Sequence, residues 1–325
     1  YNVVEPHPAS RLTSTIRGGK SERINMKILL TEPKEIHTDA VKLLKEAGHS
    51  IYLGTDTFDS KDIEVIFIRT YTLVTLEFLN KFPALKYILR AGVGLDGIDL
   101  AECKKRSITV LNSPGANANA VAEFVVATTI MLLRNASIQS NELKNGKWRN
   151  RQFIGSELKG KTIGFVGCGA IAKSIIEKLK GFSIGSIVGY DPYLSSEQLS
   201  EFNVRKVSLE ELLKVSDIVS LHLPLTDETK DLISTKELQM MEKTSYLINT
   251  SRGGIANESD LVSALENGTI AGAALDVFEN EPTISKKLLA SSKLLLTPHV
   301  AGFTREADRS IAVDVVNRFL TLKNG

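Results

Sequence analysis

Short apolar runs alternate along the chain with stretches in which apolar residues recur at helical spacing. In the first part, the runs 27–30, 65–69 and 87–91 predict strands, and the segments 35–47 and 73–80 predict the helices between them. A second and cleaner series of predicted strands follows at 162–166, 186–190, 217–221, 246–249, 271–275 and 294–297. Strands that alternate with helices in this way are typical of parallel α/β sheets.

Two long helical segments complete the pattern. The segment 120–134 is apolar on nearly every face, as a helix buried between domains or between subunits would be, and Asn119 is placed to cap its start. The segment 305–322 lies too far from the last strand to belong clearly to the second series, so we expect it to return to the first. The chain therefore predicts an α/β protein with two Rossmann-like, doubly wound parallel-sheet domains and a cleft between them. The expected boundaries are 26–114 with 301–325 for a discontinuous first domain, and 115–300 for the second.

Residues 1–25 are expected to lie outside this fold, as a leader or extension. They carry four Lys and Arg residues against two acids and contain no apolar stretch of signal-peptide length. Their origin stays open among an addition made for expression, readthrough of upstream sequence and the remnant of an organelle-targeting peptide. The first strand is expected to follow Met26.

Composition narrows the classes of protein. The chain has 325 residues, enough for two domains, with 42% hydrophobic and 24% charged residues, as in ordinary globular proteins. Its longest apolar stretch, 124–133, is too short to cross about 30 Å of hydrocarbon. Forty Lys and Arg against 38 Asp and Glu leave a formal charge of +2 without a long basic run, which argues against nucleic acid as a partner.

The two cysteines, Cys103 and Cys168, are far apart and lack C-x-x-C spacing. Neither a disulfide framework nor a metal site is expected. A reducing compartment fits best, either the cytoplasm or, if residues 1–25 are a targeting remnant, an organelle matrix.

A glycine-rich loop follows the strand 162–166, in the run Gly167-Cys168-Gly169-Ala170-Ile171-Ala172. In this G-x-G-x-x-A pattern, Gly167 permits a tight turn, Gly169 allows a pyrophosphate to approach the backbone, and Ala172 lets the helix lie close to the strand. Amides at the helix start would hold the phosphates. A glycine-rich turn required only for packing stays the alternative.

Asp191 supports the dinucleotide hypothesis. It ends the next strand, 19 residues after Ala172, close to the spacing of a ribose-binding carboxylate. A carboxylate there would accept both ribose hydroxyls and repel a 2′-phosphate, which favours NAD over NADP. A solvated strand-end aspartate is the alternative.

Hydride transfer from a hydroxy acid needs a cation for the carboxylate, a base for the hydroxyl proton and a group that tunes the base. Arg252 follows the strand 246–249, where strand ends face the ligand crevice, and two glycines after it suggest close backbone approach. His299, after the last strand, is the preferred base; His222 is the other, although its position equally suits a backbone contact with the cofactor. Glu281 and Asp276 compete as partner of the base, and the residues alone do not separate them.

Together these residues resemble the D-isomer-specific 2-hydroxyacid dehydrogenase family, and the similarity covers essentially Met26 to the C-terminus. It rests on the runs 90–96, 112–117 with 121–123, 160–169, 221–226, 249–254, 275–282 and 297–299. The resemblance implies hydride transfer between NAD and C2 of a small D-2-hydroxy acid. It implies that Arg252 binds the substrate carboxylate, that His299 is the acid/base, and that Glu281 bonds the imidazole.

The resemblance also implies the ligand contacts. Asp276 would hold the nicotinamide carboxamide, and the backbone amides of Val93 and Gly94 would bind the substrate carboxylate. The other expected cofactor-binding residues are Gly167, Gly169, Ala170, Ile171, Asp191, His222, Pro224, Thr250 and Gly302.

Within the family, the chain is most similar to members that act on a phosphorylated hydroxy acid, in a short form without the C-terminal regulatory domain of some members. Arg69, Arg90 and Arg134 would approach the phosphate, since a dianion needs such cations. Relatives that reduce glyoxylate or hydroxypyruvate are the alternative, and NAD-binding corepressors are an alternative of another class. A homodimer or homotetramer is expected from the family and from the apolar helix 120–134.

Overall fold

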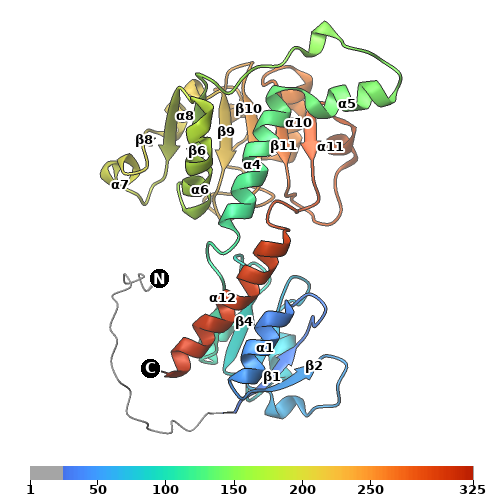
Figure 1. Cartoon of the computed structure of the whole chain (residues 1–325), viewed down its shortest axis with the longest axis vertical. Helices are drawn as coiled ribbons and strands as arrows, with labels where there is room; N and C mark the ends of the chain where they lie inside the picture. The colour runs from blue at the N-terminus through green and yellow to red at the C-terminus, as the bar shows by residue number, and fades with distance from the viewer. Residues whose placement is uncertain (1–24, 325) are drawn as a thin grey trace.

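The computed structural model describes residues 25–324, which form two parallel sheets arranged along the long axis of the molecule (Figure 1). The first sheet has five strands in the order β2-β1-β3-β4-β5, and the second has seven in the order β12-β11-β10-β9-β6-β7-β8. Both orders are doubly wound, with a reversal between β1 and β3 and another between β6 and β9. The predicted fold class is confirmed.

The first sheet uses the N-terminal part of the chain and one helix from the C-terminus. Its strands are β1 (Lys27–Leu30), β2 (Ser50–Leu53), β3 (Val65–Ile68), β4 (Tyr87–Arg90) and β5 (Thr109–Leu111). Its helices are α1 (Thr38–Glu46), α2 (Leu76–Asn80), α3 (Leu100–Lys105) and α12 (Arg305–Asn324). In Figure 1, α12 lies beside α1 and β4 and begins near the junction with the second sheet. The expected return of the last helix to the first sheet is therefore observed.

The second sheet takes up the middle of the chain. Its strands are β6 (Thr162–Val166), β7 (Ser186–Tyr190), β8 (Arg205–Lys206), β9 (Ile218–Leu221), β10 (Tyr246–Asn249), β11 (Gly272–Leu275) and β12 (Leu294–Leu296). The helices of this part are α4 (Ala118–Leu133), α5 (Ala136–Lys144), α6 (Ala170–Leu179), α7 (Ser196–Ser200), α8 (Leu209–Val215), α9 (Thr235–Leu238), α10 (Glu258–Glu266) and α11 (Lys286–Ala290). Packing of α4 on α6 covers one face of this sheet. The exact boundaries of the two expected domains stay a prediction.

The continuous apolar runs become central strands because helices cover both faces of each sheet. Every residue of β3, β9 and β11 is buried. Parallel strands enclosed in this way lose the alternation of polar and apolar positions, which is why their sequences are apolar throughout. Parallel strands also place their carboxyl ends at one edge, so the residues that follow them meet there.

The structure differs from the sequence-based expectations in one helix cap and in three strands that were not predicted. The helix expected to begin at residue 120 begins at Ala118, so Asn119 lies inside α4, where its side chain donates to Glu123 and accepts from Lys178. The alternation of apolar runs did not predict β2, β5 or β8. These strands are short and incompletely buried, so they leave a weak apolar signal.

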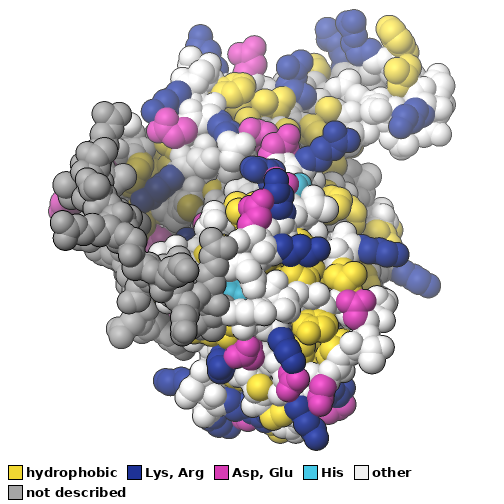
Figure 2. Space-filling model, turned by 60° about the horizontal axis from the view of Figure 1, so that its bottom comes forward, with side chains coloured by type: hydrophobic (Ala, Val, Ile, Leu, Met, Phe, Trp, Pro, Cys, Tyr) yellow, Lys and Arg dark blue, Asp and Glu magenta, His cyan; other side chains and the backbone are white. Residues whose placement is uncertain are grey.

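No single helix within residues 25–324 is both long and apolar enough to span a membrane. The helices α4 and α5 are long and apolar enough only when taken together, and they meet at a bend of 62°. On the face of the molecule seen in Figure 2, Lys and Arg side chains lie among Asp and Glu side chains rather than in a stripe of one sign.

Candidate active site

The glycine-rich loop lies at the reversal of the second sheet, directly after β6. Gly167 has φ +89°, and a Cβ added to it would lie 2.5 Å from the carbonyl oxygen of His222, so the turn itself requires glycine. Gly169 is different, because an added Cβ would meet no heavy atom within 4 Å. Packing therefore does not explain Gly169, whereas close approach of a ligand to its backbone does.

The start of α6 is suited to an anion. Gly169 is its N-cap and offers no side-chain bond to the helix, and the first turn carries no acidic residue. The first amides of the helix, at Ala170 and Ile171, therefore have no intrahelical acceptor, and the helix dipole favours negative charge beside them. These features fit the pyrophosphate of a dinucleotide.

Asp191 lies at the end of β7, beside the glycine-rich loop. Its Oδ2 accepts a hydrogen bond from the amide of Cys168 at 3.0 Å, and its Oδ1 accepts from the amides of Tyr193 and Leu194. The carboxylate is thus fixed against the loop where the sequence predicts a ribose. A negative charge at this position disfavours a 2′-phosphate.

The Arg252 turn follows β10. Asn249 holds this turn by accepting from Ser251 and donating to the carbonyl oxygen of Arg252. A Cβ added to Gly253 would collide with the carbonyl group of Phe278, so the close backbone approach expected after Arg252 is present. This contact brings the Arg252 turn beside the loop that carries Glu281.

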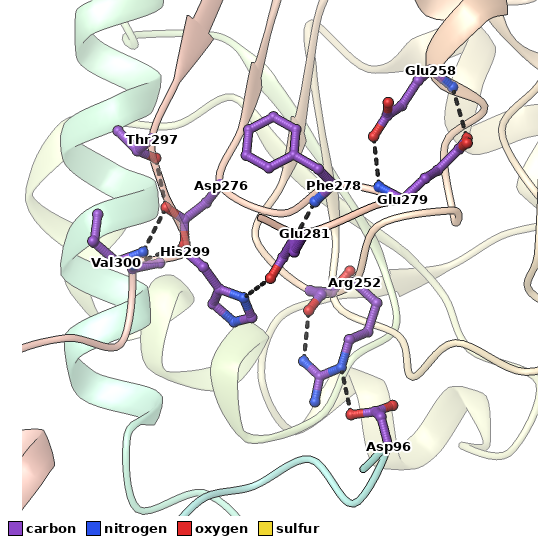
Figure 3. A network of polar contacts seen from close by, with 12 residues as sticks. Asp96, Arg252, Glu258, Asp276, Phe278, Glu279, Glu281, Thr297, His299 and Val300 are labelled. Carbon is purple, nitrogen blue, oxygen red and sulfur yellow. Dashed lines mark hydrogen bonds and ion pairs between the residues drawn. The ribbon is translucent and has the colours of Figure 1, made fainter. Parts of the chain in front are cut away.

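His299 and Glu281 form a hydrogen-bonded pair. Nδ1 of His299 lies 2.8 Å from Oε2 of Glu281, whose other carboxylate oxygen accepts from the amide of Phe278. Figure 3 shows this pair next to Arg252, with the imidazole and the guanidinium directed to the same side. Since Nδ1 is used by Glu281, Nε2 is the ring atom left to exchange a proton with a substrate.

Asp276 holds the backbone around His299 and does not bond its ring. Its Oδ1 accepts from Thr297 at 2.6 Å and from the amide of Val300 at 2.9 Å (Figure 3). Its Oδ2 accepts from the amide of Ala301 at 2.8 Å. His299 itself has φ +55°, a left-handed conformation that is costly for residues other than glycine and asparagine. The sequence left Glu281 and Asp276 open as partners of His299, and the geometry favours Glu281.

His222 is enclosed below the glycine-rich loop. Its Nε2 lies 2.8 Å from Oγ of Ser220, and burial lowers the pKa of the imidazole from 6.5 to about 3. A ring that stays neutral through the physiological range is a poor proton acceptor. Of the two histidines considered as base, the geometry favours His299.

The first sheet contributes guanidinium groups to the same cleft. Arg90, at the end of β4, is largely buried, and burial together with the positive charges of Arg69 and Arg252 lowers its pKa to about 10. The loop after β4 carries Val93 and Gly94, and a Cβ added to Gly94 would collide with the Arg252 guanidinium. Nε of Arg252 in turn donates to Asp96 at 3.0 Å. This ion pair joins the two sheets across the cleft.

Unpartnered polar atoms mark the same region. Within residues 25–324, the buried side-chain nitrogen and oxygen atoms without a hydrogen-bond partner are Nη1 of Arg69, Nδ1 of His222 and Oγ1 of Thr250. All three residues were predicted to bind substrate or cofactor. Buried polar groups are rarely left unpaired without reason, so these atoms fit a site completed by ligands.

Three other predicted residues have different surroundings. Pro224 is exposed just beyond β9, and Gly302 packs against Asn117 at the start of α4. Arg134, however, follows the last residue of α4, which is 16 residues long, so it lies about 24 Å along the helix from the end near the cleft (Figure 1). Within one chain, the expectation that Arg134 joins Arg69 and Arg90 is wrong, because α4 carries it away from them.

Three acidic residues near these arginines were not predicted. Asp96 pairs with Arg252, and Asp308 of α12 pairs with Arg69 at 2.8 Å. Glu32, which follows β1, accepts from four consecutive amides, those of residues 69–72, at 2.8–3.1 Å. An acid directly after a strand was a usable signal for Glu32, since the reversal of the first sheet lies between β1 and β3.

The chain matches a family model over more than half of its length. The model described as "D-isomer specific 2-hydroxyacid dehydrogenase, NAD binding domain" matches residues 126–301, which include the glycine-rich loop, Arg252, Glu281 and His299. Among solved structures, the chain is similar to D-lactate dehydrogenase from Aquifex aeolicus, complexed with NAD and lactic acid, with a TM-score of 0.79 and 29% identity. That similarity covers 92% of this chain and 96% of the other.

The curated relatives with similar sequences include two kinds of enzyme. The chain is 36% identical over 306 residues to D-3-phosphoglycerate dehydrogenase of Methanocaldococcus jannaschii, covering 92% of this chain and 58% of the relative. It is also 36% identical over 260 residues to hydroxypyruvate reductase of Thermotoga maritima, covering 79% of this chain and 84% of the relative. The chain thus spans about half the length of the phosphoglycerate dehydrogenases that it matches, from 46% to 58%.

Proposed function

The chain belongs to the D-isomer-specific 2-hydroxyacid dehydrogenase family, and we propose that it transfers a hydride between NAD and C2 of a small D-2-hydroxy acid. The observation that carries the proposal is the meeting of Arg252, His299 and Glu281 at the carboxyl edge of the sheet that holds the NAD-binding loop. Bound NAD would accept or supply the hydride.

The side chains perform the remaining steps. Arg252 holds the substrate carboxylate and polarises the C2 oxygen, which fixes the C2–H bond in one orientation. During oxidation, Nε2 of His299 takes the proton of the C2 hydroxyl as the hydride leaves, and the carbonyl forms. Glu281 stabilises the imidazolium through Nδ1 and holds the ring in place. In the reverse direction, the same nitrogen returns the proton to the carbonyl oxygen.

The finer proposal is that the substrate is D-3-phosphoglycerate, which would make this chain the first enzyme of serine biosynthesis. The similarity to D-3-phosphoglycerate dehydrogenases supports it, and so does the pair of arginines at the ends of β3 and β4. Arg69 and Arg90 supply two cations for a phosphate dianion.

Reduction of hydroxypyruvate or glyoxylate is the second candidate. One observation favours it: Asp308 already pairs with Arg69, so part of the positive charge is neutralised before any substrate binds. The hydroxypyruvate reductase of Thermotoga maritima is also matched over 84% of its length.

The test follows nicotinamide absorbance with the full chain, NADH and three keto acids: 3-phosphohydroxypyruvate, hydroxypyruvate and glyoxylate. We expect at least one to be reduced, and we expect NADH to be used in preference to NADPH because of Asp191. Reduction of none of these or of other 2-keto acids would contradict the proposed activity.

We propose further that the protein works as a homodimer in a reducing compartment such as the cytoplasm. The segment after α4 supports the first point, since α5 has no buried residue and Trp148 and Ile154 are 81% and 73% exposed. The two described cysteines are buried and unpaired, in keeping with the second. Light scattering of the purified chain measures the oligomeric state.

A further inference from the structure

Asp308 places a negative charge on the arginines of the first sheet. It lies in the first turn of α12, and its Oδ1 is 2.8 Å from Nη2 of Arg69. The Arg69 side chain is only 10% exposed, and that of Asp308 is 31% exposed. The pair is therefore partly shielded from water, and its charge interaction is stronger than that of a pair at an open surface.

Arg69 has binding capacity that Asp308 does not use. Its Nη1 is buried without a partner. The neighbouring Arg90 has its pKa lowered to about 10, first by burial and then by the positive charges of Arg69 and Arg252. The guanidinium groups of Arg69, Arg90 and Arg252 thus lie close enough to repel one another, and an anion that binds the free nitrogen of Arg69 is expected to be stabilised there.

Two other acidic residues lie near Arg69 and Arg90, but their hydrogen bonds go to other groups. Asp96 binds Nε of Arg252. Glu32 accepts hydrogen bonds from four backbone amides of the 69–72 loop, and its negative charge also acts on Arg90, whose pKa it raises. Among the residues that the structure describes, Asp308 is the carboxylate paired with Arg69.

We propose that Asp308 is a specificity-determining residue, which holds Arg69 in an ion pair that a substrate phosphate must displace. It lowers the preference of the cleft for phosphorylated 2-keto and 2-hydroxy acids relative to those without phosphate. This inference rests on the proposed function of the site. It goes further than the proposed function, because it names Asp308 as the residue that selects between acids with and without a phosphate.

The test compares 3-phosphohydroxypyruvate with hydroxypyruvate, which differ only by the phosphate. In Asp308→Asn, we expect the ratio of their kcat/KM values to rise about ten-fold in favour of the phosphorylated acid, mainly through its KM, because Arg69 becomes free for the phosphate. The gain should shrink at high salt. Asp314→Asn is the matched control: Asp314 lies on the same helix, its side chain is 35% exposed, and it pairs with Arg318. Its ratio should stay at the wild-type value.

Two further variants separate charge from packing. Asp308→Glu keeps the charge and should keep the ratio within about two-fold of wild type, whereas Arg69→Gln should abolish the gain that Asp308→Asn produces. A folded Asp308→Asn protein with an unchanged ratio, or an Asp308→Glu protein that shifts as far as Asp308→Asn, would overturn the inference while leaving the proposed function intact. If wild type reduces neither acid, the inference falls; the proposed function falls with it only if glyoxylate and other 2-keto acids are not reduced either.

Discussion

The two walls of the cleft differ in how completely their charges are paired. The catalytic wall, Arg252, Glu281 and His299 on the second sheet, is closed by short contacts: Glu281 bonds His299, and the turn at Asn249 holds Arg252. The arginine wall, Arg69 and Arg90 on the first sheet, has a buried nitrogen without a partner and a guanidinium whose pKa is lowered to about 10. The difference fits the proposed function, in which the catalytic wall performs the same reaction on every substrate and the arginine wall binds the part that differs between substrates.

The largest effect is expected at the catalytic wall, from His299→Asn. Asparagine tolerates the left-handed backbone at this position better than alanine, so the change removes the imidazole with little backbone strain. We expect kcat to fall by about 10²- to 10⁴-fold, as when a general acid/base is lost, with NAD affinity nearly unchanged. His299→Ala should behave alike in kcat. Steady-state kinetics and titration of NADH fluorescence measure both quantities, and an equal loss of cofactor binding would refute the assigned role.

Arg252→Lys tests whether this wall recognises the carboxylate by its geometry. Lysine keeps the charge but loses the planar fork, so a two-point contact with a carboxylate is lost. We expect kcat/KM to fall by about 10- to 100-fold for every acid, phosphorylated or not. If kcat/KM falls only for phosphorylated acids, Arg252 acts with the arginine wall, and the difference between the two walls is contradicted.

Gly169→Ala tests the cofactor side of the catalytic wall. The added methyl meets nothing within 4 Å in the protein, so the melting temperature should hold, while NAD affinity should fall about ten-fold because the backbone approach is blocked. Gly181→Ala is the matched control, since Gly181 also faces open space, outside the crevice. Calorimetric titration with NAD compares them, and equal affinities for both variants would contradict the placement of the pyrophosphate.

The smallest effect concerns stability. Burial lowers the pKa of His222 to about 3, so between about pH 6.5 and pH 3 the unfolded chain binds a proton that the folded chain does not. The free energy of unfolding should therefore fall as the pH falls through this window, by at most about 1.4 kcal/mol per pH unit from this group. His222→Asn should flatten the dependence. Urea unfolding at pH 7 and pH 5 measures this change for wild type and for His222→Asn. If the free energy of unfolding changes equally with pH in both proteins, His222 is charged in the folded state.

The sequence predicted the catalytic wall better than the arginine wall, and the reason is distance along the chain. Gly167, Asp191, Arg252 and His299 each follow a strand, and parallel strands bring their ends to one edge. Local pattern therefore carried most of the information. It failed to separate Glu281 from Asp276, because their roles depend on how one loop folds back on itself, with Glu281 at the ring and Asp276 at the backbone amides.

The arginine wall depends on contacts that no local pattern contains. Asp308 reaches Arg69 from the last helix, and Asp96 reaches Arg252 from the other sheet. The first pair exists because the last helix returns to the first sheet, and the second because the two sheets meet at the cleft. Arg134 shows the opposite case: the resemblance to the family assigned it to the substrate, but the length of α4 places it at the far end of the helix within one chain.

Direct transfer of the C2 hydrogen tests the central claim most closely. The full chain is mixed with NAD and D-glycerate or D-3-phosphoglycerate labelled with deuterium at C2, and the reduced cofactor is analysed by mass spectrometry. The account predicts one deuterium per NADH with wild type and almost none within the same time with His299→Asn. Unlabelled NADH, or equal labelling from the L-enantiomers, would contradict it.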